Sequence, residues 1–480
     1  MPFIIPANSA VSGGFDVSNS LRFNDGSSDY LNRTQGTPTN ADKFTLSVWV
    51  KRCGLTTNDY HYIASFDGGS NPREHIRFND GTDQLTWYFR DGSGTASDLT
   101  TNRLFRDVSA WYHILCVYDS TQGTNSNRQK IYVNGVQETS FSSSGYVAQN
   151  TDSNLNTNSN NIKIGVLGVS SPEEDNSAGF FDGYMAEYVF IDGSALAPDQ
   201  FGEFDEDSGI WKPIDVSGLT FGTNGFYLDF ENSGALGNDA AGSNNFTVNN
   251  LTATDQSTDT CTNNFATLNP LQNLGNNIAY SDGNLTITPG TSDYKTTSST
   301  IAVGSGKWYA EFKAVSGHNG STDVSIGIVG ADTFLASTTS KAMSAYTNAF
   351  SYGSGGLVKQ YNGATIRTDA TFTNGNIIGI AVDMDNLKLY WSKNGTYNNS
   401  GDPTSGSTGT GAIAITAGQP YYICAATISS GGVKVFSANF GSPPYANSSS
   451  AADGNGFGDF EYAPPSGYFS LNTKNLAEYG

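Results

Sequence analysis

The chain has 480 residues, with 24 lysines and arginines against 45 aspartates and glutamates, and its formal net charge is −21 at pH 7. So acidic a protein lacks the basic footprint that displaces counterions from nucleic acid, and it is equally unsuited to docking on anionic lipid. Its 55 glycines accompany many turn-forming, β-branched and aromatic residues, a mixture that favours short strands joined by tight turns. Apolar residues recur with a period of two, which predicts an all-β protein with very little helix.

The N-terminal segment, residues 1–13, contains the apolar run Pro2-Phe3-Ile4-Ile5-Pro6. No basic region precedes this run, and the run is too short for a secretory signal. The segment either anchors the chain by adding a strand to another protein or forms an edge strand of its own domain, and the sequence leaves both open. No later apolar stretch approaches the length of a membrane span.

Residues 14–254 predict the first of two antiparallel β-sandwich domains in series. Residues 43–51 alternate between polar and apolar side chains, as in a strand with one buried and one exposed face. Asn134-Gly135 lies between two alternating runs, which is a strong signal for a type I′ hairpin. Residues 181–191 predict a late strand, and residues 197–201 predict a short helical turn with a proline at an early position.

These segments, together with Trp111-Tyr112-His113 before an apolar strand, resemble in their order the concanavalin A-like, laminin-G-type jelly roll. The resemblance implies that Trp49 and Trp111 are buried core residues. We expect His113 to lie at the surface of a sheet.

Residues 255–275 turn to threonine, asparagine and aspartate and predict a linker. Residues 276–480 then predict the second sandwich. Its last segment, residues 460–469, has aromatic residues on both sides of a double proline. This pattern favours a C-terminal strap packed on the domain, and a disordered end is the alternative.

The second sandwich resembles a SPRY domain. The segments that carry the resemblance follow one another in the expected order: residues 306–312, 325–330, 350–353, 377–383, 387–395 and 439–441. The resemblance implies that this domain binds partners rather than catalysing a reaction, and that Trp308 and Trp391 lie on core strands. Residues 383–386 are expected to form a hairpin turn.

The order of the two domains, with residues 263–270 between them and residues 464–467 and 471–473 near the end, resembles a group of virion appendage proteins of marine bacteriophages. The resemblance implies a tail-fibre, head-fibre or similar structural protein at the virion surface, made in the host cytoplasm. It implies other virion proteins as partners, recognition of a bacterial surface glycan or protein, and a homo-oligomer or many copies per particle. A capsid or tail decoration protein with only virion partners is the main alternative, and a polysaccharide depolymerase is a further one.

No catalytic constellation stands out, so we expect the protein not to be an enzyme. Residues 203–207 (Glu-Phe-Asp-Glu-Asp) follow the predicted helical turn and depart from the alternating carboxylates of concanavalin-like glycosidases, which favours a solvated acidic loop. The four histidines are dispersed, and no nucleophile elbow is present. The cysteines Cys53, Cys116, Cys261 and Cys424 are widely spaced and are expected to be free thiols, with Cys116 a small core residue.

Aromatic side chains on loops are the candidates for ligand binding, because a flat ring covers the apolar face of a pyranose. The candidates are Tyr60, Trp87, Tyr88 and Tyr146 in the first domain, and Tyr346, Tyr361 and Tyr397 in the second. Each of them has packing as an alternative role. Asp67, Asp80 and Asp83, with Asp91 nearby, form a possible Ca²⁺ site, although Asp-Gly pairs also make ordinary tight turns. No other cofactor is expected.

Overall fold

The computed structural model describes residues 14–55, 60–69, 71–167, 179–272, 278–290, 293–320 and 324–480. The chain separates into two compact units, with the boundary between Thr262 and Asn263. We call them the N-terminal unit and the C-terminal unit. The possible anchor, residues 1–13, lies outside the described residues.

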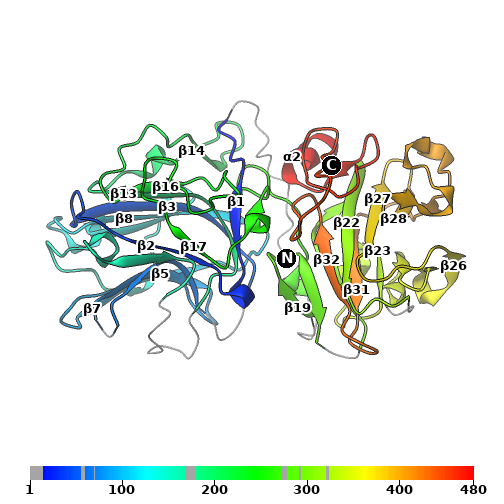
Figure 1. The fold of residues 1–480 in the computed structure, drawn as a ribbon, viewed down its shortest axis with the longest axis horizontal. Coiled ribbons are helices and arrows are strands. Elements are labelled where there is room, and N and C mark those ends of the chain that lie inside the picture. The colour runs from blue at the N-terminus through cyan, green and yellow to red at the C-terminus, as the bar shows by residue number, and fades with distance from the viewer. Residues whose placement is uncertain are drawn as a thin grey trace. The chain divides into compact units, whose positions relative to one another are not determined.

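The N-terminal unit is a sandwich of two antiparallel sheets, with a small hairpin beside them (Figure 1). Sheet A runs in the order β10 (Val136–Gln137), β9 (Gln129–Val133), β8 (Trp111–Asp119), β3 (Lys43–Arg52), β13 (Gly183–Asp192), β1 (Ser20–Phe23) and β18 (Gln256–Ser257), with β16 (Phe226–Leu228) also paired to β13. Sheet B runs in the order β11 (Phe141–Ser144), β7 (Ala96–Leu104), β6 (Gln84–Arg90), β5 (Arg73–Phe78), β4 (His61–Asp67), β12 (Asn161–Ile164), β2 (Tyr30–Thr34) and β17 (Thr247–Asn249). The hairpin consists of β14 (Gly202–Phe204) and β15 (Trp211–Pro213).

The C-terminal unit is a second sandwich. Sheet C runs in the order β19 (Ile278–Ser281), β20 (Thr286–Pro289), β32 (Val435–Asn439), β22 (Lys307–Ser316), β27 (Ile377–Asp383), β28 (Lys388–Lys393) and β29 (Thr396–Tyr397). Two short strands join it at the side: β30 (Ile413–Ala414) pairs with β28, and β33 (Phe469–Ser470) runs parallel to β22. Sheet D runs in the order β21 (Lys295–Val303), β31 (Tyr421–Thr427), β23 (Ser325–Gly330), β24 (Ala349–Gly353), β25 (Leu357–Gln360) and β26 (Thr365–Thr368).

Helix is sparse in the described part of the chain, as the sequence predicts. The α-helices are α1 (Ala331–Leu335) and α2 (Thr473–Tyr479). The 3₁₀ turns are η1 (Asp25–Ser27), η2 (Asn125–Asn127), η3 (Asn154–Asn156), η4 (Pro198–Gln200), η5 (Ala253–Asp255), η6 (Pro270–Gln272), η7 (Met343–Ala345), η8 (Tyr361–Gly363), η9 (Asn398–Ser400) and η10 (Pro403–Thr408). Among the described residues, no helix has the length and apolar character needed to cross a membrane.

The all-β prediction is confirmed, and so are three of its local signals. Asn134 and Gly135 have φ of 48° and 75° and join β9 to β10, as a type I′ turn requires. The expected helical turn is η4, with Pro198 at its start. The Asp383 carboxylate accepts hydrogen bonds from the Asn386 backbone N–H (2.9 Å) and side chain (2.8 Å), which builds the β27–β28 turn.

The expectation of one exposed face for β3 is wrong. Every residue of β3 after Lys43 is buried, because a second apolar layer covers the outer face of sheet A. In that layer Trp49 packs with Trp211 of β15, and Phe201 packs with Leu115. Trp49 is buried as the resemblance implied, whereas Trp111 is only half-buried.

The expected linker, residues 255–275, is not a free connection in its described part. Gln256–Ser257 forms β18 of sheet A, and Asp259 is 1% exposed in the N-terminal unit. Beyond the boundary, Phe265 and Leu268 are buried in the C-terminal unit. The polar side chains of this segment make hydrogen bonds inside the protein. In the sequence alone, such a segment looks the same as a solvated linker.

The C-terminal strap is packed as predicted. Phe460 and Tyr468 are buried against Tyr309, and β33 adds a strand to sheet C. Helix α2 follows, with the Asn472 side chain accepting a hydrogen bond from the Asn475 N–H at 2.9 Å. The alternative of a disordered end therefore does not apply.

Candidate functional site

Two of the aromatic ligand-binding candidates are core residues. Trp87 is 0% exposed on β6, and its indole Nε1–H donates to Glu74 at 3.0 Å inside the sandwich. Tyr346 is 2% exposed and packs on Phe334 of α1 with ring centroids 5.3 Å apart. The expectation that these two side chains lie exposed on loops is wrong, because both are enclosed by neighbouring apolar side chains.

Three further candidates differ in exposure. Tyr146 is half-buried against the core of the N-terminal unit. Tyr397 is half-buried beside Tyr390, with ring centroids 6.4 Å apart. Tyr361 is 45% exposed at the turn between β25 and β26, as a loop candidate should be.

The remaining candidates, Tyr60 and Tyr88, belong to one continuous group that we call the aromatic row: Tyr88, His75, Tyr62, Arg77 and Tyr60. The row crosses β6, β5 and β4 on the face of sheet B that points away from the core, since the core side chains alternate with it along each strand. Tyr88 stacks on His75 (centroids 4.8 Å, 13°), and Tyr62 meets His75 edge-on at 5.2 Å. The Arg77 guanidinium lies 3.8 Å from the Tyr60 ring centroid and donates to the Tyr62 hydroxyl at 2.9 Å.

His75 is the unusual member of the aromatic row. It is 1% exposed, and neither ring nitrogen has a hydrogen-bond partner in the described structure. Burial, and then the positive charges of Arg77 and Arg73, hold its pKa well below the usual value. The ring is therefore neutral near pH 7, and both of its nitrogens are enclosed beneath the neighbouring side chains of the aromatic row.

The aspartates of the possible calcium site do not converge. Asp67 lies at the end of β4 and pairs with Arg73 at 3.0 Å, at one end of β5. Asp83 follows the other end of β5, and its two oxygens pair with Arg52 (3.1 Å) and Arg106 (2.9 Å). Asp80 lies in the same β5–β6 turn as Asp83. Within the described residues, no group of three or more acidic, histidine or cysteine side chains could hold a metal ion.

The acidic run 203–207 forms a salt-bridged turn. Contrary to expectation, its first residues lie in a strand, β14, where Glu203 pairs with Lys212 at 3.2 Å. Asp205 accepts hydrogen bonds from the Ser208 N–H and hydroxyl at 2.9 and 2.8 Å. These carboxylates are occupied in holding a turn and do not face each other across a cleft.

A serine–histidine contact is also not catalytic. His113, expected at the sheet surface, is 0% exposed beneath Trp211, and burial lowers its pKa to about 3. The Trp211 Nε1–H donates to Nδ1 at 3.0 Å, so Nε2 carries the proton and donates to the Ser47 hydroxyl at 2.8 Å. A general base needs the opposite arrangement, with an unprotonated nitrogen facing the hydroxyl.

The four cysteines are free, and Cys116 is 0% exposed in the core as predicted. Sequence reasoning missed Tyr62, His75 and Arg77 as members of the aromatic row. The alternation Arg73-Glu74-His75-Ile76-Arg77 carried the signal, because it sets three polar side chains on the face opposite Ile76.

Comparison with known proteins agrees with the architecture of the N-terminal unit. Residues 25–200 match the family model of the concanavalin A-like lectin/glucanases superfamily. A search of curated proteins finds no match.

Solved structures resemble parts of the chain. The SPRY domain of human HERC1 is 16% identical, with a TM-score of 0.29, over 36% of this chain and 96% of that chain. A Bacteroides ovatus protein with a suggested carbohydrate-binding role is 18% identical, with a TM-score of 0.35, over 49% of this chain and 59% of that chain. A heptameric pentraxin of Limulus polyphemus is 15% identical, with a TM-score of 0.28, over 39% of this chain and 82% of that chain.

Proposed function

We propose that the protein is a non-enzymatic fibre or appendage protein of a bacteriophage virion that recognises a glycan on the bacterial surface. The aromatic row on sheet B carries the glycan part of this proposal. The match of residues 25–200 to a superfamily of lectins and glucanases supports it, because both of these classes of protein bind sugars. The virion part rests on the order of the two domains, the second of them SPRY-like.

The aromatic row has the chemistry that a sugar needs. Tyr60 and Tyr88 are partly exposed rings that can cover the apolar face of a pyranose. Arg77 and Asn79 lie together, with the Arg77 Nε–H donating to the Asn79 side-chain oxygen at 3.3 Å, and both can bond hydroxyl groups.

The pairing of the acidic groups supports a non-enzymatic role. Near the aromatic row, Asp67 and Asp83 pair with arginines. In the run 203–207, Glu203 pairs with Lys212 and Asp205 caps a turn. Hydrolysis of a glycosidic bond needs two carboxyl groups facing one bond, one of them free to donate a proton. Incubation with host envelope polysaccharide should therefore release no new reducing ends, and clear turnover would contradict the proposal.

The test of glycan recognition is binding of the purified chain to intact host cells and to their isolated surface polysaccharide, against a non-host strain. Tyr88→Ala should weaken binding at least about tenfold, the loss expected for an aromatic anchor, while circular dichroism stays unchanged. Tyr294→Ala, an exposed tyrosine in the other unit that is not a ligand-binding candidate, is the matched control and should bind like the natural chain.

His75→Phe separates recognition from packing. The phenyl ring keeps the stack on Tyr88 but removes both buried ring nitrogens, so stability should be kept or rise while binding through the partly exposed Tyr88 ring is retained. Unchanged binding in Tyr88→Ala would remove the aromatic row as the site.

The virion assignment has its own test. The protein should be found in purified particles by mass spectrometry, in many copies, and its absence would end this part of the proposal. Deletion of residues 2–12 should prevent incorporation if the segment is an anchor. A protein present in particles that binds neither strain would be a decoration or scaffold protein with only virion partners.

A further inference from the structure

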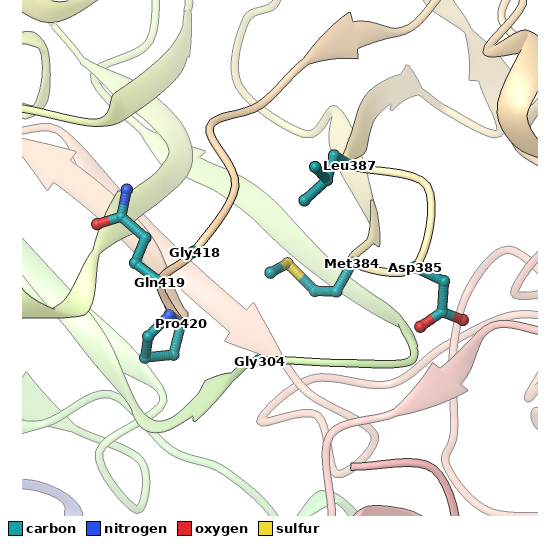
Figure 2. Close-up of a pocket in the computed structure, with 7 residues that line it drawn as sticks. All are labelled: Gly304, Met384, Asp385, Leu387, Gly418, Gln419 and Pro420. Atoms are coloured by element: carbon teal, nitrogen blue, oxygen red, sulfur yellow. The ribbon is translucent and has the colours of Figure 1, made fainter.

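A second candidate site lies in the C-terminal unit, where three loops line a pocket of about 390 Å³ that is open to solvent (Figure 2). Gly304 comes from the β21–β22 loop, and Met384, Asp385 and Leu387 come from the β27–β28 turn. Residues 418–420 lead into β31. The volume is at the lower end of the range for ligand sites, so the pocket suits a single long side chain better than an oligosaccharide.

The pocket has apolar walls. In Figure 2 the side chains of Met384 and Leu387 extend toward the chain segment that carries Pro420. Met384 is 7% exposed, whereas Leu387 and Pro420 are half-buried. Gly304 and Gly418 add backbone without side chains, which leaves the space between the loops open.

Hydrogen bonds fix the three loops before any ligand arrives. The Met384 N–H donates to the Gly306 oxygen, and the Gly306 N–H donates to Oδ1 of Asp385, both at 2.9 Å. The Ile415 N–H donates to the oxygen of Leu387 at 3.1 Å, which supports that residue in a left-handed conformation with φ of 56°. A preformed pocket loses little conformational freedom when it binds.

One negative charge lies at the edge of the pocket, on the Asp385 side chain, which extends away from the Met384 side chain in Figure 2. Asp385 is exposed, and within the described part of the chain no lysine, arginine or histidine pairs with it. Lys307, at the start of β22, pairs with Asp383 instead, at 3.2 Å. An apolar pocket with a carboxylate at its edge complements an aliphatic stem that ends in a cation.

We propose that this pocket accepts a lysine or arginine side chain from a basic segment of a protein partner. The methylenes pack on Met384, Leu387 and Pro420, and the cation meets Asp385. The net charge of −21 favours approach of a basic partner at long range. The site lies in the C-terminal unit and does not depend on glycan recognition by the aromatic row.

The chain offers a direct probe, because it contains only four methionines and one of them lines the pocket. In the full-length protein labelled at methionine methyl carbons, the Met384 signal reports on the pocket. Met185 and Met343, which are 0% and 1% exposed elsewhere, are internal references. The probes are five-residue peptides with arginine, lysine, norleucine or glutamate between glycines.

Arginine and lysine peptides should shift the Met384 signal in a saturable way and leave Met185 and Met343 unmoved. Norleucine should bind about fivefold more weakly, since it lacks the contact with a rim carboxylate, and glutamate should not bind. Asp385→Asn keeps the oxygen that accepts from Gly306 and should remove the preference for arginine over norleucine. Asp402→Asn, an exposed carboxylate outside the pocket, should preserve it.

Equal binding of norleucine and arginine would overturn the proposal in favour of a purely apolar anchor. So would an unchanged titration in Asp385→Asn, or no shift of Met384 at peptide concentrations up to about 10 mM. Tyr88→Ala should leave the peptide titration intact, so failure of the aromatic row and failure of this pocket are distinguishable.

Discussion

Removal of the Asp259 carboxylate should destabilise the N-terminal unit strongly. Lys51 Nζ and Asp259 Oδ2 are 2.7 Å apart, and the two side chains are 0% and 1% exposed. The other oxygen, Oδ1, accepts the Trp111 Nε1–H at 3.1 Å. Asp259→Ala would therefore remove the anionic partner of a buried ammonium group and the acceptor of an indole N–H.

Breaking a buried ion pair by removing one partner costs about 3–5 kcal/mol, and an unsatisfied neutral donor costs about 1–3 kcal/mol more. We expect a loss of at least about 4 kcal/mol, a large share of the 5–15 kcal/mol typical of a domain. Urea unfolding followed by tryptophan fluorescence measures it. With a slope of about 3 kcal/mol per molar, the midpoint of the N-terminal transition should fall by more than about 1 M.

Two variants make this prediction refutable. Lys51→Met combined with Asp259→Leu removes both charges and should recover most of the loss, because buried ion pairs are often replaceable by apolar side chains. Asp199→Ala, an exposed carboxylate on η4, should change stability by no more than about 0.5 kcal/mol. A loss below about 1 kcal/mol for Asp259→Ala, or a double variant as unstable as the single one, would refute the role given to this pair.

Three other outcomes are expected. Burial raises the pKa of Glu311 from 4.5 to about 7, so its stabilising effect is full below about pH 4.5 and is lost as the pH rises to about 7. The free energy of unfolding of the C-terminal unit should therefore fall over this range by on the order of 3 kcal/mol, and it should fall less in Glu311→Gln. Gly135→Ala should lower stability by more than about 1 kcal/mol in urea unfolding, because a Cβ there would lie 2.4 Å from the Trp211 ring and φ is +75°. EDTA should change neither the melting temperature nor cell binding, because Asp67 and Asp83 are paired with arginines. A clear fall in either quantity would support a calcium site at these aspartates.

The strands were predictable because the relevant physics is local. Residues 43–51 and 377–383 alternate or run apolar as strands must, and Asn134-Gly135 specifies its own turn. The layer over sheet A was not predictable from β3 itself. Burial of the second face of sheet A depends on Phe201 and Trp211, which lie more than a hundred residues after β3 in the sequence. No local pattern in β3 predicts that contact.

The candidate site was predictable only in part for a related reason. Trp87 and Tyr88 are adjacent, so one had to face the core and the other the outside, and the sequence does not say which. The structure places Trp87 inside, where Glu74 accepts its indole N–H, and Tyr88 outside on His75. The position of His75 beside it depends on the register between β5 and β6, which only the folded sheet defines.

Buried carboxylates hold irregular segments of this chain in place by accepting hydrogen bonds from their backbone N–H groups. In the sequence, these segments look like linkers or loops. Glu74 accepts the N–H groups of Asn154 and Leu155 at 2.8 and 3.2 Å. Glu311 does the same for residues 461 and 462 of the strap, at 3.0 and 2.8 Å. Each such group anchors a segment that has no partner strand to satisfy its backbone.

The same observation changes what the acidity of the chain means. Glu74 and Glu311 are each 0% exposed, so part of the formal charge of −21 is assigned to groups that lie inside the two sandwiches and do not face a partner. Composition therefore overstates the charge that a partner meets, and the location of each carboxylate matters more than their number. Asp385 differs in kind, because it accepts a single backbone N–H and remains exposed beside an apolar pocket. A carboxylate in that position contributes little to folding and is available to a cationic partner of the kind proposed above.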